Sequence, residues 1–102
     1  MAEWVKVGEV GSPAQGEVTV VTPRGDRIAL ANVDGDYYAI DDVCTHDGGP
    51  LDQGEVFDNE IECPRHGARF DVRTGKALTL PAVQPVKSYP VRIEGNDILI
   101  EV

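Results

Sequence analysis

Two short stretches, "CTHDGGP" at 44–50 and "CPRHGARF" at 63–70, constrain this chain more than any other part of its sequence. Each holds one cysteine and one histidine among glycine and proline, and the chain has no other cysteine or histidine. Thiolates favour zinc or iron-sulfur centres, and imidazole binds zinc, copper, iron and nickel. The two pairs therefore predict a metal centre, either structural zinc or an iron-sulfur cluster, with ligands Cys44, His46, Cys63 and His66.

The mixed composition of each pair helps to choose between these centres. A zinc finger of the common kind pairs cysteine with cysteine and histidine with histidine around one ion. Here each stretch contributes one residue of each type, which suits a cluster of two chemically distinct irons. A disulfide between Cys44 and Cys63 is a third interpretation, and a reducing compartment disfavours it.

Length and composition indicate one globular domain spanning residues 1–102. Hydrophobic residues make up 41% and charged residues 26% of the chain, which are ordinary values for a globular protein in water. No apolar run approaches the roughly 20 residues that span a bilayer. The start, "MAEWVKVGEV", lacks the pattern of a signal peptide. We therefore expect a cytoplasmic protein that binds no membrane.

The net charge of -9, from 18 acidic and 9 basic residues, argues against nucleic acid as a partner. Binding to nucleic acid depends largely on clustered Lys and Arg. Between Arg27 and Arg65 there is no Lys or Arg, whereas ten carboxylates occur there. This segment is either a solvated face that keeps the protein in solution or, from Asp34 to Glu62, a docking surface for a basic protein partner.

Short runs of β-branched and aromatic residues recur between turn signals such as "TPRGD", "VDGD" and "EGND", which is typical of an all-β domain with antiparallel strands. Pro90 falls inside one run and must lie at a bulge or a sheet edge. At the C-terminus, Val91 and Ile93, then Ile98, Ile100 and Val102, alternate with Arg92, Asp97 and Glu101, which indicates a hairpin with one buried face. The expected strands are 3–7, 17–22, 27–32, 37–40, 86–94 and 97–102.

The middle third of the chain, about 41–81, differs from the rest because apolar residues are sparse and glycine, proline and aspartate dominate. We expect loops that cannot form a core of their own. A bound metal centre would then supply the missing cross-link, as it does in small metal-dependent domains.

The pattern C-x-H, sixteen residues, C-x-x-H resembles the Rieske 2Fe-2S motif. The stretches "CTHDGGPLDQGEV", "IECPRHGARFDVRTGKAL" and "LPAVQPVKSYPVRIEGNDILIEV" are similar to the small Rieske ferredoxins, the electron carriers of bacterial aromatic-ring dioxygenase systems. The resemblance implies an all-β, Rieske-like fold, in which antiparallel sheets form a base domain and a small cluster-binding subdomain is inserted at about 41–81. It also implies one 2Fe-2S cluster per chain, with Cys44 and Cys63 on an inner iron and His46 and His66 on an outer iron.

Several positions depart from the high-potential Rieske proteins. Gly49 and Arg65 stand where those proteins have the cysteines of a bracing disulfide, and Ala68 and Phe70 stand where they have hydroxyl-bearing residues. Hydrogen bonds to sulfur stabilise the extra electron, and a nearby carboxylate such as Asp47 opposes it. The resemblance therefore predicts a potential toward the lower end of the roughly -150 to +300 mV Rieske range.

If all four ligands are used, no histidine remains for acid–base catalysis and no thiol for nucleophilic attack, and the chain also lacks the phosphate-binding patterns GxGxxG and GxxxxGK[ST]. The resemblance then implies a monomeric one-electron carrier rather than an enzyme. It would pass electrons from an NAD(P)H-dependent flavoprotein reductase to a terminal oxygenase in aromatic hydrocarbon catabolism. One alternative is a Rieske-type small accessory subunit of a nitrite reductase or other redox enzyme. Another, of a different class, is a zinc-stabilised binding module.

Overall fold

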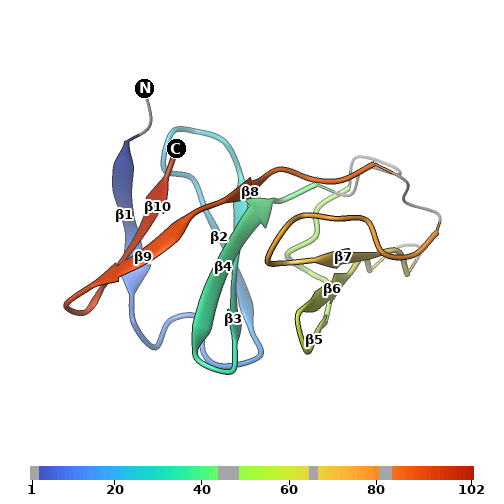
Figure 1. Ribbon diagram of the computed structural model, residues 1–102, viewed down its shortest axis with the longest axis horizontal. Coiled ribbons are helices and arrows are strands. Elements are labelled where there is room, and N and C mark those ends of the chain that lie inside the picture. The colour runs from blue at the N-terminus through green and yellow to red at the C-terminus, as the bar shows by residue number, and fades with distance from the viewer. Residues whose placement is uncertain (1–2, 44–48, 65–66, 81–83) are drawn as a thin grey trace.

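The computed structural model describes residues 3–43, 49–64, 67–80 and 84–102. Over these ranges the chain forms three antiparallel sheets that lie one after another along the molecule (Figure 1). The described residues contain no helix long and apolar enough to cross a membrane. The all-β fold class expected from the sequence is confirmed.

The described residues form ten strands, and their pairing divides them among the three sheets. One sheet has the order β1-β10-β9, with β1 at Trp4–Glu9, β10 at Asp97–Glu101 and β9 at Val91–Glu94. The central sheet has the order β2-β3-β4-β8, with β2 at Val18–Val21, β3 at Ile28–Val33, β4 at Asp36–Asp41 and β8 at Ser88–Tyr89. The third has the order β5-β6-β7, with β5 at Val56–Phe57, β6 at Glu60–Glu62 and β7 at Arg69–Asp71.

Strand β3 is buried on both faces, because the central sheet lies between the other two (Figure 1). Side chains on a strand alternate between its faces. Ile28 and Leu30 accordingly join one core, while Ala29 and Ala31 join another. The first core is completed by Tyr37, Ala39, Ile98 and Ile100. The second is completed by Val33, Ile40, Leu51, Ile61, Cys63, Ala68, Phe70, Val72 and Val86.

Strands β1 to β4 and β10 lie within one or two residues of their predicted ranges, but the predicted strand 86–94 is two strands. It breaks at Pro90, which has no N–H to donate, and β8 pairs with β4 whereas β9 pairs with β10. Both β8 and β9 are edge strands, so the edge position expected for Pro90 is confirmed. The predicted C-terminal hairpin is also confirmed, with Ile93 opposite Ile98, but Ile93 is 44% exposed and does not belong to a buried face.

The expectation that the middle third lacks a core was wrong. Four of its apolar side chains, Leu51, Ile61, Phe70 and Val72, are at most 1% exposed and share one core with the central sheet. The sequence did not indicate their burial, because β6 and β7 have only three residues each, too few to display an alternation, and Leu51 and Val72 lie outside the strands. Packing against the central sheet therefore helps to hold this segment, in addition to any cross-link by a metal.

The segment that carries β5 to β7 is inserted between two neighbouring strands of the central sheet. The chain leaves β4 at Asp41 and returns to pair Ile40 with Ser88 and Ala39 with Tyr89. At the root of the insertion, the Asp41 N–H donates a hydrogen bond to the Lys87 carbonyl at 2.9 Å. Both cysteine–histidine stretches belong to this inserted segment.

Candidate metal centre

Of the four expected ligands, the structure describes Cys63, and Cys44, His46 and His66 lie outside the described residues. Cys63 directly follows β6 and is a free thiol that is 1% exposed. It belongs to the same core as Ala68. The sequence-predicted ligand that can be located thus lies in an apolar environment sheltered from water.

We call residues 63–68, which include Cys63 and His66, the second ligand stretch. Two backbone hydrogen bonds close it at its base. The Cys63 N–H donates to the Ala68 carbonyl at 2.6 Å, and the Gly67 N–H donates to the Cys63 carbonyl at 3.0 Å. Gly67 has a φ of 74°, which lies in the left-handed region that glycine adopts without steric cost. Its N–H is used within the stretch, so the role of Gly67 is to return the chain toward Cys63.

The strands on either side of this stretch add a charged contact. Glu62 and Arg69 are partners in the β6–β7 ladder, and the Arg69 Nε lies 3.1 Å from the Glu62 Oε2. The same guanidinium group lies 5.4 Å from the centre of the Phe57 ring. The Arg69 N–H donates to the Thr79 hydroxyl at 2.9 Å, and the Leu78 N–H donates to the Arg69 carbonyl at 2.8 Å. Arg69 therefore joins three neighbouring segments beside Cys63.

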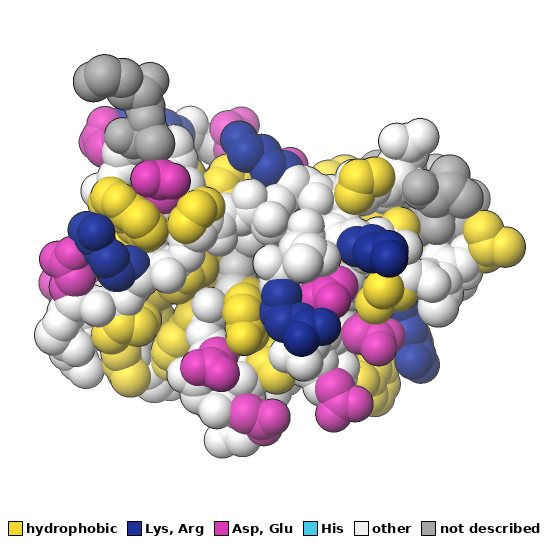
Figure 2. All heavy atoms as spheres, viewed as in Figure 1, with side chains coloured by type: hydrophobic (Ala, Val, Ile, Leu, Met, Phe, Trp, Pro, Cys, Tyr) yellow, Lys and Arg dark blue, Asp and Glu magenta, His cyan; other side chains and the backbone are white. Residues whose placement is uncertain are grey.

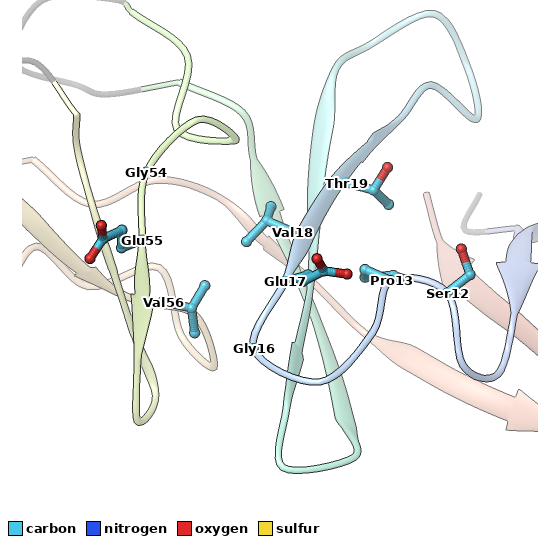
Figure 3. A pocket seen from close by; sticks show the side chains of 9 residues that line it. All are labelled: Ser12, Pro13, Gly16, Glu17, Val18, Thr19, Gly54, Glu55 and Val56. Carbon is cyan, nitrogen blue, oxygen red and sulfur yellow. The ribbon is translucent and has the colours of Figure 1, made fainter.

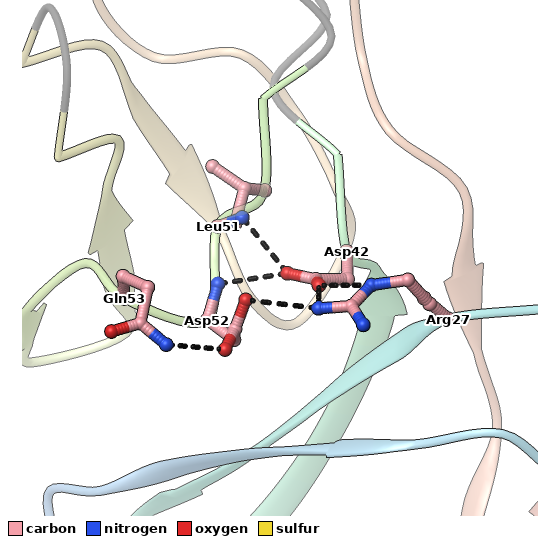
Figure 4. Close-up of polar contacts among 5 residues, drawn as sticks. All are labelled: Arg27, Asp42, Leu51, Asp52 and Gln53. Carbon is pink, nitrogen blue, oxygen red and sulfur yellow. Dashed lines mark hydrogen bonds and ion pairs between the residues drawn. The ribbon is translucent and has the colours of Figure 1, made fainter.

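We call residues 43–50, which include Cys44 and His46, the first ligand stretch. The side chain of a neighbouring residue closes it. The Oδ1 atom of Asp42 accepts hydrogen bonds from the backbone N–H groups of Leu51 and Asp52, both at 2.8 Å. Its Oδ2 atom accepts from Arg27, from Nε at 3.1 Å and from Nη2 at 2.9 Å (Figure 4). One buried carboxylate thus holds together the two ends of the stretch.

The two ligand stretches meet through Gly54. The turn that follows the first stretch brings Gly54 so close to β6 that an added Cβ would lie 1.8 Å from the Glu62 carbonyl oxygen. The Glu62 N–H also donates to the Glu55 carbonyl at 2.9 Å. Because Glu62 immediately precedes Cys63, the base of one stretch packs against the backbone that leads into the other.

Arg27, Asp42 and Gly54 were not among the residues that the sequence singled out. A partial signal existed for Arg27, which is the last cation before the ten carboxylates that precede Arg65. A carboxylate excess of that size indicates that flanking arginines have acidic neighbours. Asp42 and Gly54 give no periodic signal, because their contacts depend on how the insertion folds back on the central sheet.

The donors in the described part fit a soft metal centre. A buried cysteine sulfur suits zinc or iron, and Ala68 and Phe70, both fully buried in the same core, bring no polar group against it. Within the described ranges, no group of three or more His, Cys, Asp or Glu residues is placed to hold an ion. Cys63 is thus the one predicted ligand that the described ranges include, and Cys44, His46 and His66 stay predictions.

Comparison with known proteins identifies the family of this chain. A profile described as the Rieske [2Fe-2S] domain matches residues 3–90. The ferredoxin component of the naphthalene 1,2-dioxygenase system of Pseudomonas putida is 41% identical over 99 residues, which cover 97% of this chain and 95% of the relative. The resemblance to Rieske ferredoxins stated from the sequence is confirmed.

Solved structures agree with this relationship. The ferredoxin of carbazole 1,9a-dioxygenase from Nocardioides aromaticivorans IC177 matches with a TM-score of 0.92 and 37% identity over 95% of each chain. A chain in a complex of reduced oxygenase and oxidized ferredoxin in carbazole 1,9a-dioxygenase matches with a TM-score of 0.89 and 30% identity, over 95% of this chain and 91% of that one. A putative NADH-dependent nitrite reductase small subunit from Mycobacterium tuberculosis, 23% identical with a TM-score of 0.89 over 100% of this chain and 96% of that one, shares the fold. By sequence profile, relatives and fold, the chain belongs to the Rieske [2Fe-2S] domain family.

Proposed function

We propose that this chain is the ferredoxin component of an aromatic-ring dioxygenase system. It carries one electron at a time from an NAD(P)H-dependent flavoprotein reductase to a terminal oxygenase, and it catalyses no reaction of its own. The observation that carries the proposal is the match over nearly the whole chain to a protein named as a dioxygenase ferredoxin component. The solved complex of an oxygenase with a similar ferredoxin supports the oxygenase as electron acceptor.

We propose that Cys44, His46, Cys63 and His66 together hold one 2Fe-2S cluster per chain, in a subdomain at about 41–81 of a single domain. When bound, the cluster supplies one-electron redox chemistry. The described residues have supporting roles. They bury the Cys63 sulfur, close both ligand stretches at their bases and exclude water with the side chains of Ala68 and Phe70.

The surface charge supports a protein that docks transiently with basic partners. The predicted docking surface, Asp34 to Glu62, proves to be divided, because Asp52 pairs with Arg27, and Glu60 and Glu62 pair with Arg69. Figure 2 shows Lys and Arg side chains among the acidic ones at the end that carries β5 to β7, whereas the lower edge of this face carries acidic side chains. Four carboxylates from the segments 12–19, 33–34 and 54–58 have no ion pair among the described residues: Glu17, Asp34, Glu55 and Asp58.

These four carboxylates line a groove between the central sheet and the insertion. Its walls are the segment 12–19 and the segment 54–58, and Val18 and Val56 point toward the space between them (Figure 3). Two adjoining hollows make up this groove, one lined by Glu17 and Glu55 and the other by Asp34 and Asp58, and Gly16 and Val56 line both. We propose this acidic groove, rather than the whole of Asp34 to Glu62, as the surface that attracts a basic partner.

Metal analysis and spectroscopy of the anaerobically purified protein test the proposed function. We expect about two irons and two sulfides per chain, a red-brown oxidised form and, after dithionite reduction, a rhombic EPR signal of mixed His/Cys ligation. A colourless protein with about one zinc would contradict the proposal and support the zinc-stabilised binding module instead.

Electron transfer tests the partners. We expect the monomeric protein to accept electrons from the flavoprotein reductase of such a system, at a rate that falls as ionic strength rises. The double variant Asp34→Asn/Asp58→Asn should weaken that salt dependence, whereas Asp97→Asn, on the β1-β10-β9 sheet and paired with Lys6, should not. Stable co-purification with a larger enzyme would instead favour the accessory subunit of a nitrite reductase or other redox enzyme. Cell fractionation tests the proposed cytoplasmic location.

A further inference from the structure

We propose that Arg27 and Asp42, neither of which is an expected ligand, are positioning residues that control how firmly the cluster is held and at what potential it works. This inference rests on the ligand assignment in the proposed function. Arg27 lies just before β3 of the central sheet, and Asp42 lies just after β4, at the entrance to the first ligand stretch. The pair therefore connects the central sheet to the metal centre.

Asp42 is a buried charge whose hydrogen-bonding capacity is well used. Its side chain is 0% exposed, and its two oxygens accept four hydrogen bonds, two from backbone N–H groups and two from Arg27. The Asp42 N–H also donates to the Arg27 carbonyl at 3.1 Å. A buried carboxylate is tolerated when it is paired and hydrogen-bonded in this way, and removal of its partner leaves an uncompensated charge.

Arg27 serves a second carboxylate as well. Its Nη2 atom lies 3.5 Å from Asp52 Oδ1, a buried oxygen that accepts no hydrogen bond from the described residues. Figure 4 shows the guanidinium group in contact with both acidic side chains. In the described part of the chain, Arg27 is the one cation that pairs with either of them. One positive charge thus offsets two carboxylates that flank the first ligand stretch.

The contacts of this pair reach both ligand stretches. Asp42 lies two residues before Cys44, and it holds Leu51 and Asp52 at the other end of the first stretch. Two residues farther on, Gly54 packs on the carbonyl of Glu62, the neighbour of Cys63. Displacement of the 51–54 turn would therefore disturb the first stretch directly. It would also disturb the second stretch, because Gly54 is tightly packed against the Glu62 backbone.

Two consequences follow for a loaded protein. Residues that orient ligands without binding the metal commonly change metal affinity 10- to 100-fold when they are substituted. Reduction adds an electron to the cluster, so an uncompensated negative charge nearby opposes it. Loss of the Arg27 charge should therefore weaken cluster retention and shift the potential to more negative values. Loss of the Asp42 charge should also weaken retention, but shift the potential to more positive values.

The test compares Arg27→Gln with Arg24→Gln in the cluster-loaded protein. Arg24 is the matched control for Arg27. The Arg27 side chain is 57% exposed and the Arg24 side chain is 50% exposed, and each pairs with a carboxylate. They differ in that the partner of Arg24 is the exposed Glu3. We expect Arg27→Gln to release the cluster roughly 10- to 100-fold faster under a chelator, measured by visible bleaching, and to have a lower potential. Arg24→Gln should match the wild type in both.

Asp42→Asn and Arg27→Lys complete the design. Asp42→Asn keeps an oxygen that can accept the two backbone hydrogen bonds, so it also serves if Arg27→Gln folds poorly. Far-UV circular dichroism of each cluster-loaded variant checks folding. Arg27→Lys restores the charge without the two-pronged contact and should recover most of the potential but less of the retention. Asp52→Asn added to Arg27→Gln should raise the lowered potential again.

Opposite potential shifts in Arg27→Gln and Asp42→Asn support the inference, because a general loosening of the fold would not reverse sign. If the wild type holds a 2Fe-2S cluster and Arg27→Gln behaves as Arg24→Gln does, the inference is overturned while the proposed function stands. A wild type that holds no 2Fe-2S cluster overturns both.

Discussion

The Oδ1 atom of Asp42 accepts a hydrogen bond from the Leu51 N–H at 2.8 Å, across the first ligand stretch. The second stretch is closed by backbone, because the Cys63 N–H reaches the Ala68 carbonyl directly, and the Glu62–Arg69 side-chain contact flanks that closure. Two stretches that match in sequence are therefore closed by different means. The first depends on a buried charge and its counter-ion, and the second continues the ladder between β6 and β7.

Substitution of Gly54 tests the contact between the two stretches. We expect Gly54→Ala to lower the free energy of unfolding by about 1–3 kcal/mol or more, because the new methyl group would overlap the Glu62 carbonyl oxygen at 1.8 Å and backbone must move. Gly8→Ala is the matched control, since its Cβ would lie 3.6 Å from the nearest atom, the Ser12 carbonyl oxygen, an ordinary contact. Urea unfolding measures both. Equal effects would show that the Gly54 contact relaxes freely.

Matched core substitutions separate the stability of the fold from retention of the cluster. Ile61 and Ile98 are both fully buried, but Ile61 shares a core with Cys63 and Ile98 lies in the core on the other side of the central sheet. We expect Ile61→Val and Ile98→Val each to cost about 0.5–1.5 kcal/mol of unfolding free energy. Only Ile61→Val should speed cluster loss under a chelator, and equal acceleration by both would contradict this assignment.

The reduction potential tests the effect of having Ala68 and Phe70, which carry no hydroxyl group, in the Cys63 core. We expect the wild type to fall toward the lower end of the roughly -150 to +300 mV Rieske range, and Ala68→Ser or Phe70→Tyr to raise the potential by adding a donor in the Cys63 core. Phe57→Tyr is the control, because Phe57 is 42% exposed and its added hydroxyl would meet water. Protein-film voltammetry measures all four proteins. An unchanged potential in both core variants would count against hydrogen bonding as the cause.

Tyr89 gives a pH dependence that is independent of the metal. Burial raises the pKa of the Tyr89 phenol, and its hydrogen bond to the Asp41 carboxylate at 2.5 Å raises the pKa further. Since the pKa is higher in the folded state, the stabilisation is fully present below the unfolded value of about 10 and is lost as pH rises toward the folded value. Thermal unfolding of the wild type and Tyr89→Phe should therefore differ most at neutral pH and converge above about pH 10. A constant difference would contradict the raised pKa.

The strands that carry clear alternation could be predicted from sequence. The hairpin that pairs Ile93 with Ile98 and Val91 with Ile100 follows directly from the two apolar runs and the glycine turn between them. Pro90 likewise marked the position where one predicted strand divides into two. Local chemistry was sufficient at these positions, because turn residues and the lack of an N–H act on the backbone nearby.

The residues that pack around the proposed metal centre and close its ligand stretches could not be predicted in the same way. Arg27 and Asp42 lie opposite each other just beyond the paired ends of the β3–β4 hairpin, but the sequence does not show that this pair also closes the chain at Leu51 and Asp52. Ile61 and Phe70 lie in strands of three residues, where burial depends on the neighbouring sheet and not on a repeated pattern. The cysteine–histidine spacing indicated the family correctly, and the roles of the individual ligands stay predictions.

The hydrogen bond from the Asp41 N–H to the Lys87 carbonyl has a wider consequence. Because the chain departs from and rejoins the central sheet at adjacent backbone positions, the sheet keeps its strand order whatever is spliced between them. The side chains of the insertion nevertheless share a core with Ala29, Ala31 and Ile40 of that sheet. We therefore expect that the insertion could be transplanted only to a scaffold that offers two such neighbouring strands, an apolar sheet face beside them and a residue equivalent to Arg27.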